Sequence, residues 1–247
     1  MIEFILFLMI TNLKTQSVPL MIAHAGGGIH GQNYSNSLEA LDLNYANGFR
    51  IFEIDFSWTS DQQLVCLHDW EKRFKKVFGY KIKQPLSFKE FNQLLDTTNG
   101  LHPCTLQSLD DWVKEHKDVK IITDVKYHNL KAIVKILESY PNLTNNLIPQ
   151  FYQPNEYQVL KKLGFNQLIW ILYQYDGSYK SVVEHSNKME LLAVSMRASQ
   201  AKKKFADQLR NNGHNIFVYT VNDTKKVEKL VIKHNVSGIY TDFLGSQ

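Results

Sequence analysis

Short apolar runs alternate with amphipathic helical segments along most of the chain, and this alternation limits the possible folds more than any other feature. The runs are rich in β-branched and aromatic residues, and the segments between them place apolar residues three and four positions apart. Such an alternation is typical of repeated β-α units that build a parallel sheet. The eight predicted strands are 19–24, 50–57, 64–68, 119–126, 147–152, 168–174, 190–196 and 215–221.

Eight helices are predicted between and after these strands. Gly48, Gly164 and Gly213 follow three of them, at positions where a helix end favours a left-handed residue. Eight strands with their helices in 247 residues match the size of one (β/α)8 TIM barrel, a fold of the α/β class. A doubly wound open sheet is the alternative. The predicted helices are 36–47, 87–95, 106–116, 129–140, 154–163, 178–187, 200–212 and 224–234.

No Pro-rich linker or change of composition divides the chain, so we predict one barrel domain at 19–247 after an N-terminal apolar segment at 1–18. The apolar block at 4–10 is far shorter than the ~20 residues that span a bilayer. It also resembles a secretory signal poorly, because Glu3 replaces the usual positive charges. We favour a cytoplasmic location, with a periplasmic or membrane-associated one as the alternative, and assign no oligomeric state.

Charge and cysteine content narrow the class of protein. The chain has 28 basic and 24 acidic residues, and a formal net charge of +4 is too small to indicate nucleic acid as the main partner. This charge does not exclude a small acidic substrate. The two cysteines, Cys66 and Cys104, are too few for a disulfide framework and lack zinc-site spacing. Cys66 is expected to be a small buried apolar residue.

Two carboxylates stand two positions apart in the apolar stretch "FEIDF", so Glu53 and Asp55 project from the same face of a strand. If that face is a barrel interior, the two negative charges need a compensating cation, and a divalent metal suits their hard oxygen atoms. A solvated edge strand is the alternative. The stretch "IITDVKY" adds Asp124 as a third carboxylate and Lys126 as a cation that can hold a phosphate.

Two apolar runs end on histidine, at His24 and His68. A lone histidine at a strand end is usually structural, but barrel active sites are assembled from the carboxyl ends of several strands. Histidines titrate near neutrality and can exchange acid and base roles. Together with the carboxylates and the lysine, they predict metal-assisted phosphoryl chemistry.

Three glycines directly follow the first strand. Gly26, Gly27 and Gly28 are predicted to let the loop bend closely around a phosphate-sized ligand before the first helix. The helix is expected to start with Ser35 or Asn36 as its N-cap. A flexible connector is the alternative reading of the glycines.

The ordered set of these motifs resembles the glycerophosphodiester phosphodiesterase family of the phosphatidylinositol-phospholipase-C-like superfamily. The resemblance covers about residues 19–243. It is carried by "IAHAGG", "SNSLEAL", "FEIDFSWTSDQQLVCLHD", "HPCTLQSLDDW", "TDVK", "VYTVND" and "VSGIYTD".

The resemblance implies a TIM barrel that cleaves lipid-derived glycerophosphodiesters to an alcohol and glycerol phosphate. It implies His24 and His68 as the acid/base pair, with Lys126, Gly26, Gly27 and Asn36 toward the substrate. It also implies Glu53, Asp55 and Asp124 as ligands of one divalent ion, Ca²⁺ or Mg²⁺.

Two positions depart from the family pattern. Ala25 stands where an arginine is usual, and Ser35 stands where a glutamate is usual. Losing a bidentate phosphate contact weakens substrate binding unless Arg73, Arg197 or another cation reaches the site. The alternatives are therefore a lysophospholipase D or sphingomyelinase D-like enzyme that forms a cyclic phosphate, and a non-catalytic barrel that binds a phosphorylated ligand.

A basic segment at 71–83, "EKRFKKVFGYKIK", is expected on the active-site side. It could attract an anionic phosphodiester or a lipid headgroup, with Phe74, Phe78 and Tyr80 making peripheral membrane contact. A solvated loop is the alternative. The expected partner is a small-molecule or lysolipid phosphodiester.

Overall fold

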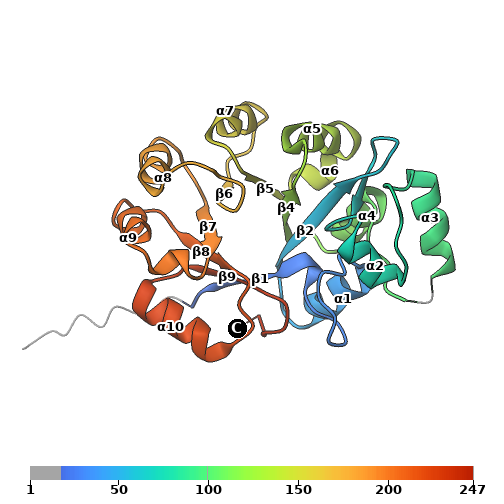
Figure 1. Ribbon diagram of the computed structural model, residues 1–247, viewed down its shortest axis with the longest axis horizontal. Helices are drawn as coiled ribbons and strands as arrows, with labels where there is room; N and C mark the ends of the chain where they lie inside the picture. The colour runs from blue at the N-terminus through green and yellow to red at the C-terminus, as the bar shows by residue number, and fades with distance from the viewer. Residues whose placement is uncertain (1–17, 99, 247) are drawn as a thin grey trace, which may run out of the picture.

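Eight parallel strands close into a barrel that is surrounded by helices, as predicted (Figure 1). The computed structural model describes residues 18–98 and 100–246, so nearly all of the predicted N-terminal segment at 1–18 lies outside them. The barrel closes where Ala23 of the first strand pairs with Phe52 of the second. The strands in barrel order are β1 (Leu20–Ala23), β2 (Ile51–Trp58), β4 (Lys120–Val125), β5 (Leu147–Phe151), β6 (Ile169–Ile171), β7 (Ala193–Arg197), β8 (Ile216–Tyr219) and β9 (Gly238–Thr241).

The set of barrel strands differs from the prediction at two places. The predicted strand 64–68 is β3 (Leu64–Cys66), which pairs antiparallel with the end of β2 and stands outside the barrel. The eighth barrel strand is β9, which was not among the eight predicted runs. The count was right for the wrong reason, because an apolar hairpin strand and an apolar barrel strand have the same local pattern.

The helices follow the predicted order with additions. A 3-10 turn (η1, His24–Gly26) follows β1, and a second one (η2, Gln200–Lys202) precedes α9. α2 and the short α6 were not predicted as helices. Gly48, Gly164 and Gly213 have the positive φ angles expected at helix ends. The helices are α1 (Leu38–Ala46), α2 (Lys72–Phe78), α3 (Phe88–Thr97), α4 (Leu106–Glu115), α5 (Asn129–Ser139), α6 (Pro141–Thr144), α7 (Pro154–Lys162), α8 (Tyr179–Ser186), α9 (Lys204–Asn211) and α10 (Thr224–His234).

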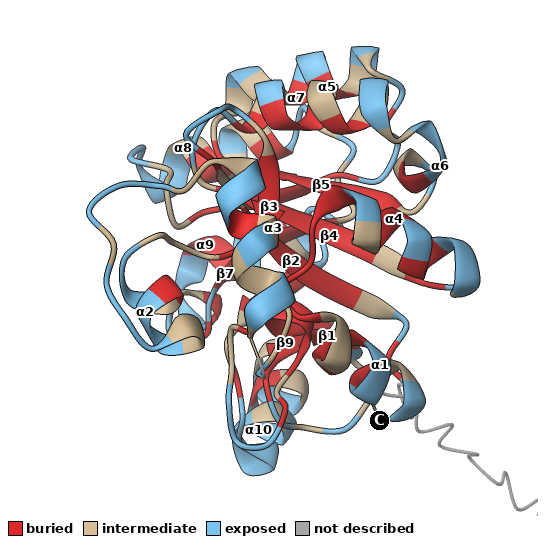
Figure 2. Cartoon of the chain, turned by 90° about the vertical axis from the view of Figure 1, so that its right-hand side faces the viewer, coloured by how far each residue is buried: buried red, intermediate tan, exposed pale blue. Residues whose placement is uncertain are grey.

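Side chains alternate along β2 between the two faces of the barrel wall. Phe52, Ile54 and Phe56 pack into the apolar layer beneath the helices, which leaves Glu53 and Asp55 on the interior face. The strands are buried, while the outer sides of the helices are exposed (Figure 2). The barrel interior is filled by a separate cluster made of Ile22, Ile122, Ile148, Ile169, Ala193, Phe217 and Tyr240.

The segment that carries α2 and α3 forms its own small core beside the barrel. Val65 and Leu67 pack there against Phe74 and Phe91. The prediction that Phe74 contacts a membrane is wrong, because its side chain is completely buried in this cluster. Phe78 also packs against the cluster, and only Tyr80 of the three aromatics is exposed.

The two cysteines form a disulfide, which the sequence did not indicate. Cys66 of β3 is bonded to Cys104, and both residues are completely buried. The backbone N–H of Cys66 also donates to the carbonyl of Cys104, and the N–H of Cys104 donates to that of Asn36. The disulfide therefore ties β3 to the segment in front of α4 and, through it, to the loop before α1.

Candidate active site

A cavity of about 220 Å³ lies at the carboxyl ends of the barrel strands. Six of the predicted site residues line it, namely His24, Glu53, Asp55, His68, Asp124 and Lys126. The remaining wall is made by Tyr34, Gln150, Ile171, Tyr173, Arg197, Tyr219, Thr220 and Tyr240.

Glu53, Asp55 and Asp124 form a compact acidic cluster. The register of the barrel pairs Asp55 of β2 directly with Asp124 of β4, and Glu53 lies one side-chain step below on the same face. One carboxylate oxygen of each residue lies within 4.8 Å of the others. All three residues are buried, so the cluster concentrates negative charge in a region with little water.

The electrostatics of this cluster call for a cation. Burial, followed by the charges of Asp55 and Asp124, raises the pKa of Glu53 well above its usual value. Burial and the charge of Asp55 likewise raise the pKa of Asp124, although Lys126 and two tyrosine hydroxyls oppose this effect. Lys126 Nζ lies 3.7 Å from Asp55 Oδ1. One ammonium group does not balance three carboxylates, and an oxygen-only donor set of this kind fits a divalent cation.

Neighbouring groups fix the orientation of each carboxylate. Asn36 clamps Asp55, because its amide donates to Oδ2 at 3.0 Å and its oxygen accepts the Asp55 backbone N–H at 3.0 Å. The backbone N–H of Ala25 donates to Glu53 Oε2 at 2.8 Å. The hydroxyls of Tyr152 and Tyr173 both donate to Asp124 Oδ1. The cluster is thus held in place by groups from the β1–α1 connection and from the segments that follow β5 and β6.

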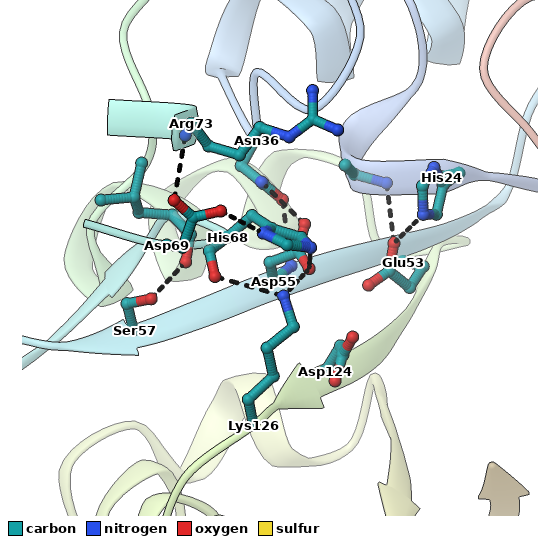
Figure 3. Close-up of polar contacts among 12 residues, drawn as sticks. His24, Asn36, Glu53, Asp55, Ser57, His68, Asp69, Arg73, Asp124 and Lys126 are labelled. Atoms are coloured by element: carbon teal, nitrogen blue, oxygen red, sulfur yellow. Dashed lines mark hydrogen bonds and ion pairs between the residues drawn. The ribbon is translucent and has the colours of Figure 1, made fainter. Parts of the chain in front are cut away.

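The two histidines approach the cluster from opposite sides (Figure 3). His24 Nε2 lies 3.9 Å from Glu53 Oε2, and His68 Nε2 lies 4.0 Å from Asp55 Oδ1. Each ring makes a hydrogen bond through Nδ1 to a further carboxylate, at 2.8 Å to Asp242 for His24 and at 2.7 Å to Asp69 for His68. This arrangement leaves Nε2 of both rings directed at the same space.

The carboxylates behind the histidines favour the ionised form. Burial acts to raise the pKa of Asp242, but the hydrogen bond and charge of His24, with the amides of Asn222 and Asn33, lower it overall. Burial also acts to raise the pKa of Asp69, and hydrogen bonds from the Arg73 backbone and His68 lower it. Each histidine is therefore oriented by an anion, which fixes the ring tautomer.

Tyr34 stands over the site between the two histidines. Its ring lies edge-on to that of His24, with centroids 4.5 Å apart, and to that of His68, with centroids 4.9 Å apart. Its φ of +61° is an unusual backbone angle for a bulky residue. The Arg73 guanidinium lies 3.7 Å above the ring. Burial and the charges of Asp55 and Glu53 raise the pKa of the Tyr34 hydroxyl, so it stays protonated at neutral pH.

The glycines after β1 occupy a different place from the predicted one. Gly26 and Gly27 are buried with positive φ and are not among the residues that line the cavity. A side chain on Gly27 would come within 2.4 Å of Asn44, whose amide donates to the carbonyls of Gly26 and Gly28. The glycines therefore let the loop wrap around helix α1, and their predicted contact with a ligand stays a prediction.

The polar residues before α1 also have other positions than expected. Asn36 is completely buried beneath Asp55 and does not line the cavity, so its contacts orient a carboxylate. The N-cap of α1 is Ser37, whose hydroxyl accepts the Ala40 N–H, in place of the predicted Ser35 or Asn36. Ala25 is also completely buried, and it serves the site through its backbone.

A match to a protein-family model identifies the family. The model described as the glycerophosphoryl diester phosphodiesterase family matches residues 27–246. The chain belongs to this family. It is therefore a phosphoric diester hydrolase, in agreement with the resemblance seen in the sequence motifs.

The relatives agree with this assignment over nearly the whole chain. The chain is 24% identical over 238 residues to YhdW of Bacillus subtilis (strain 168), covering 90% of this chain and 94% of that protein. A glycerophosphodiester phosphodiesterase from Thermotoga maritima has a similar structure, with a TM-score of 0.72, 22% identity, and coverage of 92% and 95%. An Oleispira antarctica phosphodiesterase in complex with the product sn-glycerol-3-phosphate has a TM-score of 0.66, 16% identity, and coverage of 91% and 93%. These structures confirm the barrel fold.

Sequence reasoning missed several residues that complete the site. Asp242 comes from the turn after β9 and is 218 positions from the histidine it holds. Tyr34, Tyr152 and Tyr173 carried no local signal, because tyrosines in or beside strands are ordinarily packing residues. Of the cations considered as replacements for the usual arginine, Arg197 lines the cavity and Arg73 lies behind Tyr34.

Proposed function

We propose that this protein hydrolyses glycerophosphodiesters to an alcohol and glycerol phosphate, using one divalent metal ion and the histidines His24 and His68. The observation that carries the proposal is the buried cluster of three carboxylates with a histidine Nε2 at 3.9 Å on one side and at 4.0 Å on the other. For a phosphodiester bound at this cluster, one histidine could take a proton from the attacking hydroxyl and the other could give a proton to the leaving oxygen.

Glu53, Asp55 and Asp124 are the proposed metal ligands, and Ca²⁺ or Mg²⁺ suits their oxygen atoms. When bound, the ion would neutralise negative charge on the non-bridging oxygens of the phosphate. Lys126 lines the cavity beside Asp55 and is suited to hold the phosphate as a point charge. Arg197, on the opposite wall, is a second cation available to the substrate.

The hydrogen bonds at Nδ1 determine what each histidine can do. With its Nδ1–H donated to Asp242, a neutral His24 presents an unprotonated Nε2 that can accept a proton. A charged His68 with the same bond to Asp69 presents an Nε2–H that can donate one. One histidine would deprotonate the attacking hydroxyl while the other protonates the leaving oxygen, and the two roles can exchange in a second step.

The attacking hydroxyl has two candidate sources. Water gives glycerol phosphate directly, whereas a neighbouring hydroxyl of the substrate gives a cyclic phosphate, which is the alternative product. A lysolipid substrate is the alternative to a small water-soluble diester. Among the described residues, no helix combines the length and apolar character that a membrane crossing requires.

The disulfide supports a location outside the cytoplasm, which was the alternative to the cytoplasmic location favoured from the sequence. Disulfides persist mainly in oxidising surroundings outside the cytosol. The completely buried Cys66–Cys104 bond therefore favours a periplasmic or otherwise extracytoplasmic location over the cytoplasmic one. Trapping the free thiols of the protein in intact cells tests this, and two free thiols would contradict it.

Release of glycerol phosphate from glycerophosphocholine, glycerophosphoethanolamine and glycerophosphoglycerol tests the function. The enzyme is stripped with a chelator and reloaded with Ca²⁺ or Mg²⁺. We expect turnover only after reloading, and none in Asp55→Asn. Asp96→Asn, which changes an exposed carboxylate on α3, serves as the matched control and should retain full activity. Equal turnover in the chelated enzyme, or an active Asp55→Asn variant, would exclude the proposed metal site.

A further inference from the structure

A second groove of about 800 Å³ adjoins the catalytic cavity. The cavity and the groove share two lining residues, His68 and Lys126, so the groove begins at one of the proposed proton-transfer groups. It runs between the β2–β3 hairpin, the start of α2 and the segment after β4. Its other lining residues include Trp58, Trp70, Lys72 and Lys83.

The walls of the groove include two tryptophans in fixed positions. The indole N–H of Trp58 donates to the carbonyl of Tyr127 at 2.8 Å, and that of Trp70 donates to the carbonyl of Trp58 at 2.8 Å. Trp70 also packs against Phe74 and Phe91 of the small core. Both N–H groups are used within the protein, and Lys131 Nζ lies 5.2 Å from the centre of the Trp58 ring. The indoles therefore offer the groove apolar surface in a fixed position, which suits the C–H groups of a sugar or polyol.

The charges along the groove favour an anion. Lys72, Lys83 and Lys126 line it, whereas its acidic residues are Asp69 and Glu71. Asp69 already accepts hydrogen bonds from His68 Nδ1 and from two backbone N–H groups. Within residues 18–98 and 100–246, neither Lys72 nor Lys83 has an ion-pair partner, and both are exposed. Two ammonium groups are thus available to a ligand.

We infer that this groove binds the alcohol arm of the substrate, and that the preferred arm is a polyol carrying a negative charge of its own, such as a phosphorylated polyol. This inference rests on the proposed function, since the arm is the group attached to the phosphate at the metal cluster. The groove is continuous with the cavity at His68, so a substrate held there projects its arm between the tryptophans.

Two diesters that differ only in a terminal phosphate test the inference. Glycerophosphoinositol and glycerophosphoinositol 4-phosphate are compared by kcat/KM in the metal-loaded enzyme. We expect the 4-phosphate to be preferred by up to about 25-fold, since each of two exposed ion pairs contributes up to about fivefold. In Lys72→Gln/Lys83→Gln the preference should fall to near one.

Lys75→Gln/Lys81→Gln is the matched control, because these exposed lysines belong to the same segment but do not line the groove. It should keep the preference. Equal kcat/KM for both inositol diesters in the unmodified protein, or a preference that survives loss of Lys72 and Lys83, would each overturn the inference.

Calorimetry separates this inference from the proposed function. His24→Ala protein is titrated with both inositol diesters, with and without the two groove substitutions. Tighter binding of the 4-phosphate that is lost with Lys72 and Lys83 supports the groove even if no diester is hydrolysed. Equal binding of the two diesters overturns the groove assignment, whatever the enzyme cleaves.

Discussion

The two histidines of the site have the same hydrogen-bonding chemistry but very different surroundings. His24 directly follows the barrel strand β1, and its side chain is 11% exposed. Its partner Asp242 comes from the far end of the chain. The His68 side chain is 26% exposed, and its partner is the next residue, on a hairpin outside the barrel. The barrel therefore fixes one histidine rigidly, while a peripheral segment with its own core and disulfide presents the other.

This difference suggests a division between a rigid and an adjustable half of the site. The His24 half is built from β1 and β9, which pair over four residues. The His68 half depends on β3, which pairs over three residues and is tied down by Cys66. Solvent reaches His68 more readily, and the proposed substrate groove begins on its side. The following predictions test this contrast.

Removing either histidine should have the largest effect. We expect His24→Ala and His68→Ala each to lower kcat by about 10² to 10⁴-fold, the usual contribution of general acid–base catalysis. The two variants should differ in rescue, because added imidazole can enter the more exposed space left by His68. Steady-state kinetics with and without imidazole test this. Rescue of His24→Ala alone would reverse the contrast between the two halves.

Breaking the disulfide should destabilise the protein strongly. Cys66 and Cys104 are 38 positions apart, and closing a loop of that length stabilises a fold by about 4 kcal/mol in the chain-entropy account. Urea unfolding of Cys66→Ala/Cys104→Ala should show a loss of this order. An unchanged free energy of unfolding in the variant would mean that the small core alone holds the His68 half in place.

Replacing the aspartate that bonds to each histidine with asparagine should reduce kcat by unequal amounts. An amide group opposite Nδ1 favours the wrong ring tautomer. We expect a loss of about 10²-fold for Asp242→Asn and about tenfold for Asp69→Asn, because water can replace the more exposed partner. Circular dichroism of both variants controls for folding. A larger loss for Asp69→Asn would indicate that the exposed histidine is the more constrained one.

The smallest effect concerns stability in acid. The pKa of Asp242 in the folded protein lies below its ordinary value of 3.8. The stabilisation linked to this shift is therefore fully present above pH 3.8, and it is lost as the pH falls through the lower folded value. Asp242→Asn should unfold with a shallower dependence of melting temperature on pH in this range. An unchanged slope would show that Asp242 does not contribute to acid unfolding.

The sequence predicted the acidic cluster well because strand geometry determines it. Glu53 and Asp55 share a face by alternation, and Asp124 sits on a strand of the same kind, so a closed barrel brings them together. The partner of His24 could not be predicted this way, because no local pattern links positions 24 and 242. The same holds for the disulfide, whose spacing has no signature.

Local ambiguity explains the remaining errors. The run "LVCLH" has the composition of a buried strand, and only its pairing reveals a hairpin outside the barrel. β9 begins with Gly238 and ends with Thr241, so only Ile239 and Tyr240 between them give an apolar signal. Gly27 has the conformation that the sequence suggested, but the group that approaches it is Asn44 of the protein itself. A glycine in the sequence indicates that some group approaches the backbone closely, but it does not indicate which group.

Phosphorus NMR of the reaction in ¹⁸O-labelled water tests the central claim most directly. The enzyme is incubated with glycerophosphoglycerol in Mg²⁺, in Ca²⁺ or in chelator. We predict a glycerol phosphate signal that carries the isotope shift of ¹⁸O on phosphorus and appears only with a metal ion, directly or after a transient cyclic phosphate signal. The same product in chelator, or no product from any glycerophosphodiester with either metal, would contradict the account.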